Sequence, residues 1–329
     1  MVVKDVSMAY EDLVEFRGAL SPATRDVIQL ICADDAGLRD ASLRIVDNDL
    51  STESVFRLLC AALMGAVSGD PGRAEPVCLL SRIWWAGAET LDDAMDGQLN
   101  VGAFGLPVSA ITVASIACLT VLPQEIVRLR AGNATLERMW AYELTLTNLK
   151  SAGGQLSDVT PGVATWKSVM TSYVGKSGAA YGRDTAMVAQ LAGLDPGQQN
   201  AWRLFGRLFG VLRQLANDRA ADGAPSNTDV TNGTWTLLAA HAMDTLPAGR
   251  QADFRASYER AGTDRASYDD VQEALRLPEV RSGYDRRVRR VRDQLIRLLD
   301  QVAPPSQHRD LVSWMVVSSA DAALIGSST

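Results

Sequence analysis

Apolar residues recur at three- and four-residue spacing along almost the whole chain, whereas runs of β-branched residues bounded by turn signals are almost absent. The first pattern is typical of amphipathic helices, and the second is what strands would require. Helices are predicted at residues 9–32, 51–68, 77–98, 107–129, 134–156, 165–191, 198–222, 233–245, 251–261, 268–276 and 281–302. No stretch reads as a linker, so we expect one all-α domain over residues 1–329.

The charge balance and the cysteines limit the function classes. The formal net charge of −7 argues against a nucleic-acid-binding surface. The four cysteines lie inside apolar runs without metal-ligand spacing, and no signal-peptide core opens the chain, so a cytoplasmic protein with free thiols is expected. The longest apolar stretch, residues 106–123, is interrupted by Pro107 and Pro123, which predicts a core helix and no transmembrane segment.

Three carboxylates end the apolar run Val77–Leu91. Asp92 and Asp93 lie four and three residues before Asp96 on a helix, so all three can reach one face. Like charges beside an apolar segment are costly unless a cation neutralises them, and oxygen ligands suit Mg²⁺. The triplet therefore predicts a metal site for a phosphorylated substrate. A solvated acidic helix end is the alternative interpretation.

A second set of oxygen ligands ends another apolar helix. Asp218 and Asp222 lie one turn apart, and Asn217 offers an amide oxygen beside them. Two apolar helices that each end in an oxygen cluster could face each other across a cavity and hold several cations on one diphosphate.

Five segments in order carry a resemblance to a known family. Residues 92–96 match its DDxxD motif, residues 154–158 its GQxxD, and Lys176-Ser177 its Lys-Thr pair. Residues 214–218 resemble its Q-x-x-D-D, with Asn217 in place of the first Asp. Residues 228–237 resemble the D-L-x-x-G-K-x-T-L segment that follows, with Thr234 in place of the Lys. On these segments the chain resembles the trans-isoprenyl diphosphate synthases and the class I terpene synthases that share their fold. The resemblance implies an isoprenoid synthase fold, a bundle of about ten or more helices around a central cavity.

The resemblance also implies a prenyl diphosphate substrate, two or three Mg²⁺ ions and a homodimer. The residues it assigns to catalysis are Asp92, Asp93, Asp96 and Asp218, and those it assigns to metal binding are the same four with Asn217 and Asp222. The expected diphosphate ligands are Gln155, Lys176, Arg183 and Arg219. The expected substrate pocket contains Trp84, Trp85, Gly87, Ala88 and Gln214, with the small Gly87 and Ala88 leaving space for a long prenyl chain. Core packing is the alternative interpretation of both tryptophans.

The chain departs from the family at the second metal cluster and at the second substrate. Ala221 stands at the third position of the second motif, so the third metal ligand there is undefined. The stretches that bind isopentenyl diphosphate in the family correspond to residues 48–57 and 97–107, which together hold one base, Arg57. Because a diphosphate requires several charge-assisted donors, a second diphosphate should bind poorly.

These features favour a class I terpene synthase that ionises one prenyl diphosphate of fifteen to twenty or more carbons and gives a cyclic or linear terpene. A prenyltransferase that elongates the chain, or transfers it to a non-diphosphate acceptor, is the alternative. A non-catalytic subunit of a heteromeric synthase is the third interpretation.

Residues 281–297 hold seven arginines among Val, Leu and Ile, which predicts an amphipathic helix with a solvated face.

Overall fold

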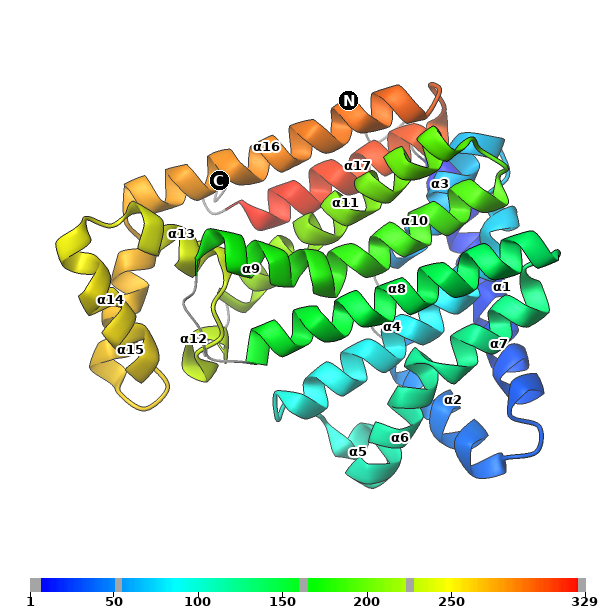
Figure 1. The fold of residues 1–329 in the computed structure, drawn as a ribbon, viewed down its shortest axis with the longest axis horizontal. Coiled ribbons are helices and arrows are strands. Elements are labelled where there is room, and N and C mark those ends of the chain that lie inside the picture. The colour runs from blue at the N-terminus through cyan, green and yellow to red at the C-terminus, as the bar shows by residue number, and fades with distance from the viewer. Residues whose placement is uncertain (1–6, 51–54, 160–164, 223–227, 325–329) are drawn as a thin grey trace. The chain divides into compact units, whose positions relative to one another are not determined.

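The computed structural model describes residues 7–50, 55–159, 165–222 and 228–324. Every regular element in these ranges is helical, which confirms the all-α prediction (Figure 1). The elements are α1 (Ser7–Ile31), α2 (Ala36–Leu50), η1 (Val55–Leu58), α3 (Leu59–Ser68), η2 (Pro71–Ala74), α4 (Glu75–Met95), α5 (Val101–Phe104), α6 (Val108–Leu119), α7 (Val121–Arg130), α8 (Ala134–Val159), α9 (Trp166–Tyr173), η3 (Val174–Gly178), α10 (Ala179–Leu191), α11 (Pro196–Asp222), α12 (Thr228–Asn232), α13 (Leu237–Thr245), α14 (Ala248–Arg260), α15 (Arg265–Leu275), α16 (Pro278–Val302) and α17 (Gln307–Ala323).

The chain forms two compact units, each assembled from three stretches of sequence. Unit 1 contains Met1–Asn148, Arg183–Arg203 and Val302–Val312. Unit 2 contains Leu149–Gly182, Leu204–Gln301 and Ser313–Thr329. Since neither unit is a continuous segment, no linker delimits it, and the expectation of one domain over residues 1–329 stays a prediction.

Unit 1 is organised around α4, which packs against α1, α2, α3, α6 and α7. The approach to α6 depends on Gly87, where a Cβ atom would lie 2.7 Å from the Cys118 Cβ and 2.8 Å from the Ser115 carbonyl oxygen. The missing side chain of Gly87 therefore allows two helix backbones to approach each other, and the expectation that it leaves space for a prenyl chain stays a prediction.

The helix predicted over residues 107–129 is two helices that meet at Thr120. Pro123 has no N–H, so the Leu119 carbonyl lacks the donor that a continuous helix would provide. The Asn148 side chain replaces it, since its Nδ2 donates to the Leu119 oxygen at 3.1 Å. The stretch Val108–Arg130 has the length and hydropathy of a membrane span, with half of its apolar window buried. A core helix of a soluble protein passes the same test, and the observed burial fits that interpretation.

Unit 2 is held together by close helix approaches at glycines. A Cβ on Gly154 of α8 would lie 2.7 Å from the Lys176 backbone nitrogen in η3. A Cβ on Gly210 of α11 would lie 2.6 Å from the Ser177 carbonyl oxygen. Because no larger residue fits at these points, α8 and α11 both pack directly onto the π-helical turn η3, and the predicted Lys-Thr-like pair lies at that junction.

Candidate functional site

The first acidic cluster lies at the C-terminal end of α4. Gly97 adopts a left-handed φ of 69°, and the Gln98 N–H donates to the Asp93 carbonyl at 2.8 Å, which ends the helix in a Schellman-type turn. Asp92 is half-buried, while Asp93 and Asp96 are exposed. All three carboxylates thus stand at the negative end of the helix dipole, where a cation is stabilised and an anion is not.

The electrostatics of this cluster fit a divalent cation. The pKa of Asp93 is raised, first by partial desolvation and then by repulsion from Asp92 and Asp96. Although much of the Asp93 side chain is exposed, its neighbours therefore penalise its charged form. Within the described residues, no three His, Cys, Asp or Glu side chains gather closely enough to hold a metal ion. A Mg²⁺ ion held here would take one or two of these carboxylates and complete its shell with water and substrate phosphate.

Trp84 and Trp85, predicted to line the substrate pocket, have different surroundings. Trp84 is 3% exposed, and its Nε1 donates to the Asn148 Oδ1 at 2.8 Å. Trp85 is half-buried and meets the Trp84 ring edge-on, with centroids 5.2 Å apart. Ala88 is half-buried. The structure thus places Trp84 in a tightly bonded core position of unit 1.

We predict that Trp84→Ala will lower the free energy of unfolding by about 3–5 kcal/mol, because it removes a large buried side chain and leaves the Asn148 oxygen without its donor. If Trp84 also lines the prenyl pocket, the variant will accept longer substrates. Thermal unfolding and chromatography of the products measure the two effects separately. Trp84→Phe is the control that keeps an aromatic ring. A stability loss with unchanged products would identify Trp84 as a core residue only.

Two arginines of unit 1 are committed to protein partners. Arg183, an expected diphosphate ligand, is 1% exposed, and its Nε donates to the Asp184 Oδ1 at 2.7 Å. Its guanidinium lies 4.6 Å from the centre of the Trp84 ring. Arg57 is hydrogen-bonded to Glu89 and lies 4.3 Å from the centre of the Trp85 ring. Arg183 is therefore buried against Asp184 and Trp84 in this structure, and its assignment as a diphosphate ligand stays a prediction.

The lysine predicted to contact the diphosphate lies on the turn η3 of unit 2. Lys176 is half-buried, and its Nζ donates to the Asp158 Oδ2 at 2.7 Å. Asp158 is the last residue of the GQxxD-like segment and also accepts from the Ser172 hydroxyl at 3.3 Å. Gln155, from the same segment, is half-buried. A π-helical turn inside a longer helix frequently marks a functional site, and here it presents the lysine.

The second oxygen cluster is organised around a buried carboxylate. Asp218 is 8% exposed and accepts hydrogen bonds from the Tyr173 hydroxyl and from the Gln214 Nε2, the latter at 3.0 Å. The Gln214 Oε1 in turn accepts from the Ser177 hydroxyl at 2.9 Å. Burial and the neighbouring Asp218 raise the pKa of Tyr173 well above its ordinary value, so this phenol remains a proton donor at neutral pH.

Tyr173 was missed by sequence reasoning, although its position one turn before Lys176 and Ser177 was a usable signal. The remaining predicted ligands of this cluster differ in exposure: Asn217 is exposed and Arg219 is half-buried. The backbone of Asp222 ends α11, but its side chain lies outside the described residues.

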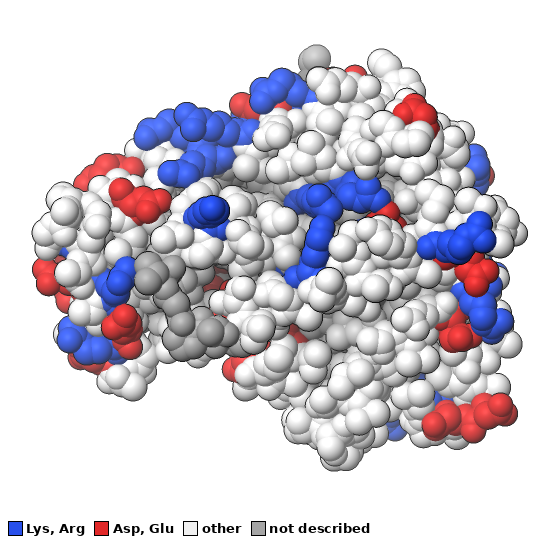
Figure 2. Space-filling view, in the orientation of Figure 1, with Lys and Arg blue, Asp and Glu red and all other residues white. Residues whose placement is uncertain are grey.

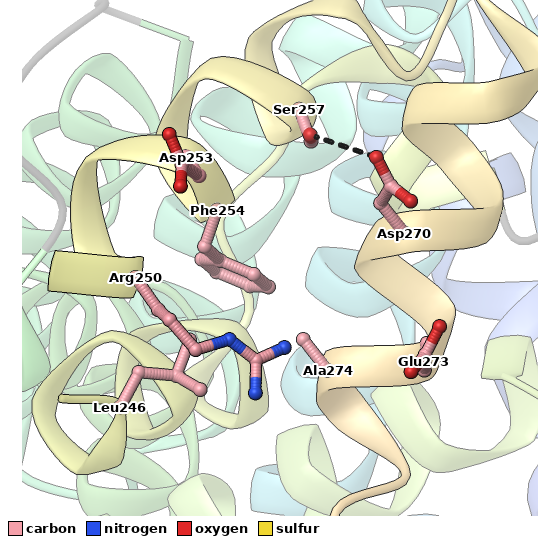
Figure 3. Close-up of a pocket in the computed structure, with 8 residues that line it drawn as sticks. All are labelled: Leu246, Arg250, Asp253, Phe254, Ser257, Asp270, Glu273 and Ala274. Carbon is pink, nitrogen blue, oxygen red and sulfur yellow. Dashed lines mark hydrogen bonds between the residues drawn. The ribbon is translucent and has the colours of Figure 1, made fainter.

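A pocket of about 200 Å³ lies elsewhere in unit 2 (Figure 3). Its lining comes from α14, α15 and the residue after α13: Leu246, Arg250, Asp253, Phe254, Ser257, Asp270, Glu273 and Ala274. The Ser257 hydroxyl donates to the Asp270 Oδ2 at 3.4 Å across it. None of the residues predicted for diphosphate or metal binding lines this pocket.

Neither a protein-family model nor a curated protein matches the sequence. Solved structures do. Geranylgeranyl pyrophosphate synthetase from Pyrococcus horikoshii OT3 has a TM-score of 0.79 at 16% identity, over 95% of this chain and 99% of that one. Heptaprenyl diphosphate synthase from Staphylococcus aureus has a TM-score of 0.73 at 14% identity, with 94% and 98% covered.

A third similar structure is geranylgeranyl pyrophosphate synthase from Corynebacterium glutamicum, complexed with isoprenyl diphosphate and magnesium. Its TM-score is 0.68 at 19% identity, and the match covers 98% of this chain and 99% of that one. These likenesses confirm the expected fold, which is that of the trans-isoprenyl diphosphate synthases.

Proposed function

We propose that this chain ionises an allylic prenyl diphosphate with the help of Mg²⁺ and transfers the prenyl group to a second substrate. The observation that carries the ionisation step is the acidic end of α4, where the pKa of Asp93 is raised first by partial desolvation and then by the neighbouring Asp92 and Asp96. Such a cluster is unfavourable until a cation binds.

We assign the metal-binding and phosphate-binding roles within unit 1 and within unit 2 separately. Asp92, Asp93 and Asp96 would hold Mg²⁺ in unit 1, and Asp218, with Asn217, would do so in unit 2; two or three ions in all remain a prediction. Bound Mg²⁺ neutralises the charge that develops on the leaving diphosphate. Lys176 would donate to a phosphate oxygen, and its ion pair with Asp158 fixes the ammonium in place before substrate arrives. Tyr173 and Gln214 would orient the Asp218 carboxylate.

Transfer is preferred over cyclisation because the similar structures named above are prenyl diphosphate synthases. This reverses the order favoured by the sequence, which placed a terpene synthase first. The likeness is one of fold, and both enzyme classes have this fold, so the choice between them depends on an activity measurement.

A class I terpene synthase is the second candidate, and one observation favours it. Arg57 is the single base in the two stretches expected to hold isopentenyl diphosphate, and it is already bonded to Glu89 and stacked on Trp85. Each lost contact between charged partners costs about 1.5–3 kcal/mol, so several missing donors would weaken a second diphosphate by orders of magnitude.

Incubation with geranyl, farnesyl and geranylgeranyl diphosphates and Mg²⁺, each with and without isopentenyl diphosphate, tests the proposal. We expect a longer prenyl diphosphate that forms only when isopentenyl diphosphate is present and that gas chromatography detects after phosphatase treatment. Omission of the metal is the control and should abolish the product. A hydrocarbon or alcohol that forms at the same rate without isopentenyl diphosphate would establish the terpene synthase instead. Absence of any diphosphate release would contradict both.

A further inference from the structure

The helix α16 presents a concentrated positive charge on a protein that is acidic as a whole. Residues 281–297 contain seven arginines and two aspartates, a net charge of +5 in a chain whose net charge is −7. Figure 2 shows blue side chains gathered along the place that α16 occupies in Figure 1. The proposed reaction uses none of these arginines.

The arginines point outward because the opposite face of α16 is occupied by the core of unit 2. The buried residues of the helix include Val280, Tyr284, Val288, Leu295 and Leu299. Arg286, Arg289, Arg290 and Arg297 are exposed, and we call these four the α16 arginine face. Arg289 stands 3.9 Å from the carboxylate of Asp285, which is buried, so part of the Arg289 charge is matched within the helix and the other three arginines carry most of the free charge of this face.

An aromatic ring adjoins this face. The half-buried Trp166, at the start of α9, has the Arg287 guanidinium 4.0 Å from its ring centre. The arginine that contacts the ring, Arg287, is itself half-buried and follows the exposed Arg286 directly in the chain. Basic side chains on a polar helix face with a tryptophan nearby are typical of helices that rest on lipid headgroups. Here the apolar face is already buried in the protein, so the contact would be electrostatic and would need no insertion into the acyl chains.

We propose that the α16 arginine face binds the surface of an anionic phospholipid membrane. The arginines are spread along the helix, with Arg286 and Arg297 about 16 Å apart along its axis, and do not converge on one point. A small phosphate ligand requires convergent donors, whereas a lipid headgroup layer is an extended anionic plane that suits a linear array.

A membrane is favoured over a nucleic acid for two reasons. Nucleic-acid-binding domains are basic overall, and a long polyanion would also meet the acidic remainder of this chain. In addition, a prenyl diphosphate is an amphiphile that concentrates at membranes, so an enzyme that uses one gains by resting there; this second reason alone depends on the proposed function.

The test is flotation of the full chain with vesicles, without substrate or Mg²⁺, so that its outcome is independent of catalysis. Vesicles of phosphatidylcholine and phosphatidylglycerol should bind the protein, and vesicles of phosphatidylcholine alone should not. Near an anionic surface each arginine contributes roughly a fivefold factor, so the triple variant R286Q/R290Q/R297Q should bind about a hundredfold more weakly. Binding of the wild type should also fall steeply as salt is added.

The matched control is R130Q/R138Q/R276Q, which removes the same charge from exposed arginines outside α16. It should retain vesicle binding. The melting temperature of R286Q/R290Q/R297Q should stay level or rise, because Arg286 and Arg290 repel each other one turn apart. Equal binding by test and control variants, equal binding to both vesicle types, or binding to heparin or polyglutamate with none to vesicles would overturn the proposal.

Discussion

Asp93→Asn is expected to lower diphosphate release by about 100- to 1000-fold, the effect typical of removing one electrostatic contributor to a transition state. The metal-free variant should fold normally and be at least as stable as the wild type, because it loses a charge that partial desolvation and the neighbouring Asp92 and Asp96 disfavour. Release of diphosphate from an allylic substrate and thermal unfolding without metal measure the two effects.

The raised pKa of Asp93 determines the direction in which its contribution to stability changes with pH. Since the folded pKa of Asp93 lies above its unfolded value of about 3.8, the folded protein binds more protons than the unfolded chain between the two values. The charged Asp93 therefore destabilises the metal-free wild type at neutral pH, and this penalty is relieved as the pH falls through that interval. Asp93→Asn lacks this penalty, so its stability advantage at neutral pH should shrink on acidification.

Asp26→Asn is the matched control, because Asp26 is an exposed carboxylate of α1 far along the sequence from the cluster. It should change neither activity nor the pH profile. Asp218→Asn tests the second cluster in the same assay. Retained activity in both Asp93→Asn and Asp218→Asn would contradict a reaction that needs two oxygen clusters.

Periodicity predicted most of the helices because their apolar faces are long and regular. It failed where the determining contact is distant in sequence: the break at Thr120 depends on Pro123 and on the Asn148 side chain that serves the freed Leu119 carbonyl. Four α-helices without a prediction, α2, α5, α12 and α17, have either mixed polarity or only four or five residues. Local patterns carry little information about such segments.

For the candidate site, motif order identified the chain segments, but not what each side chain does. The sequence grouped Arg183 with Lys176 as phosphate ligands, yet one is buried against Asp184 and Trp84 and the other is half-exposed on η3. It also took Gly87 as a spacer, and it did not reveal that α6 packs closely against that position. The partners of a charge or of a glycine are set by tertiary packing, which spacing along one helix cannot reveal.

Gly153 and Gly154 also show that tertiary packing cannot be inferred from sequence spacing. They provide the second prediction with a large expected effect. They are neighbours on α8 and indistinguishable in sequence, but only Gly154 faces η3. A Cβ on Gly154 would lie 2.7 Å from the Lys176 nitrogen and 3.0 Å from both the Gly175 carbonyl carbon and the Ser172 carbonyl oxygen. All three are backbone atoms, so no side-chain rotation can make room.

Gly154→Ala should therefore destabilise the protein by about 1–3 kcal/mol through overpacking, and it should lower activity by displacing η3 and with it the Lys176–Asp158 ion pair. Gly153→Ala should be neutral or stabilising by up to about 1 kcal/mol, because a Cβ there meets no atom within 4 Å and alanine favours the helix. Urea unfolding of the two variants isolates the contact, since they differ by one position in the same helix. Equal stability and equal activity would mean that α8 and η3 do not pack at Gly154, and the position assigned to Lys176 would then be wrong.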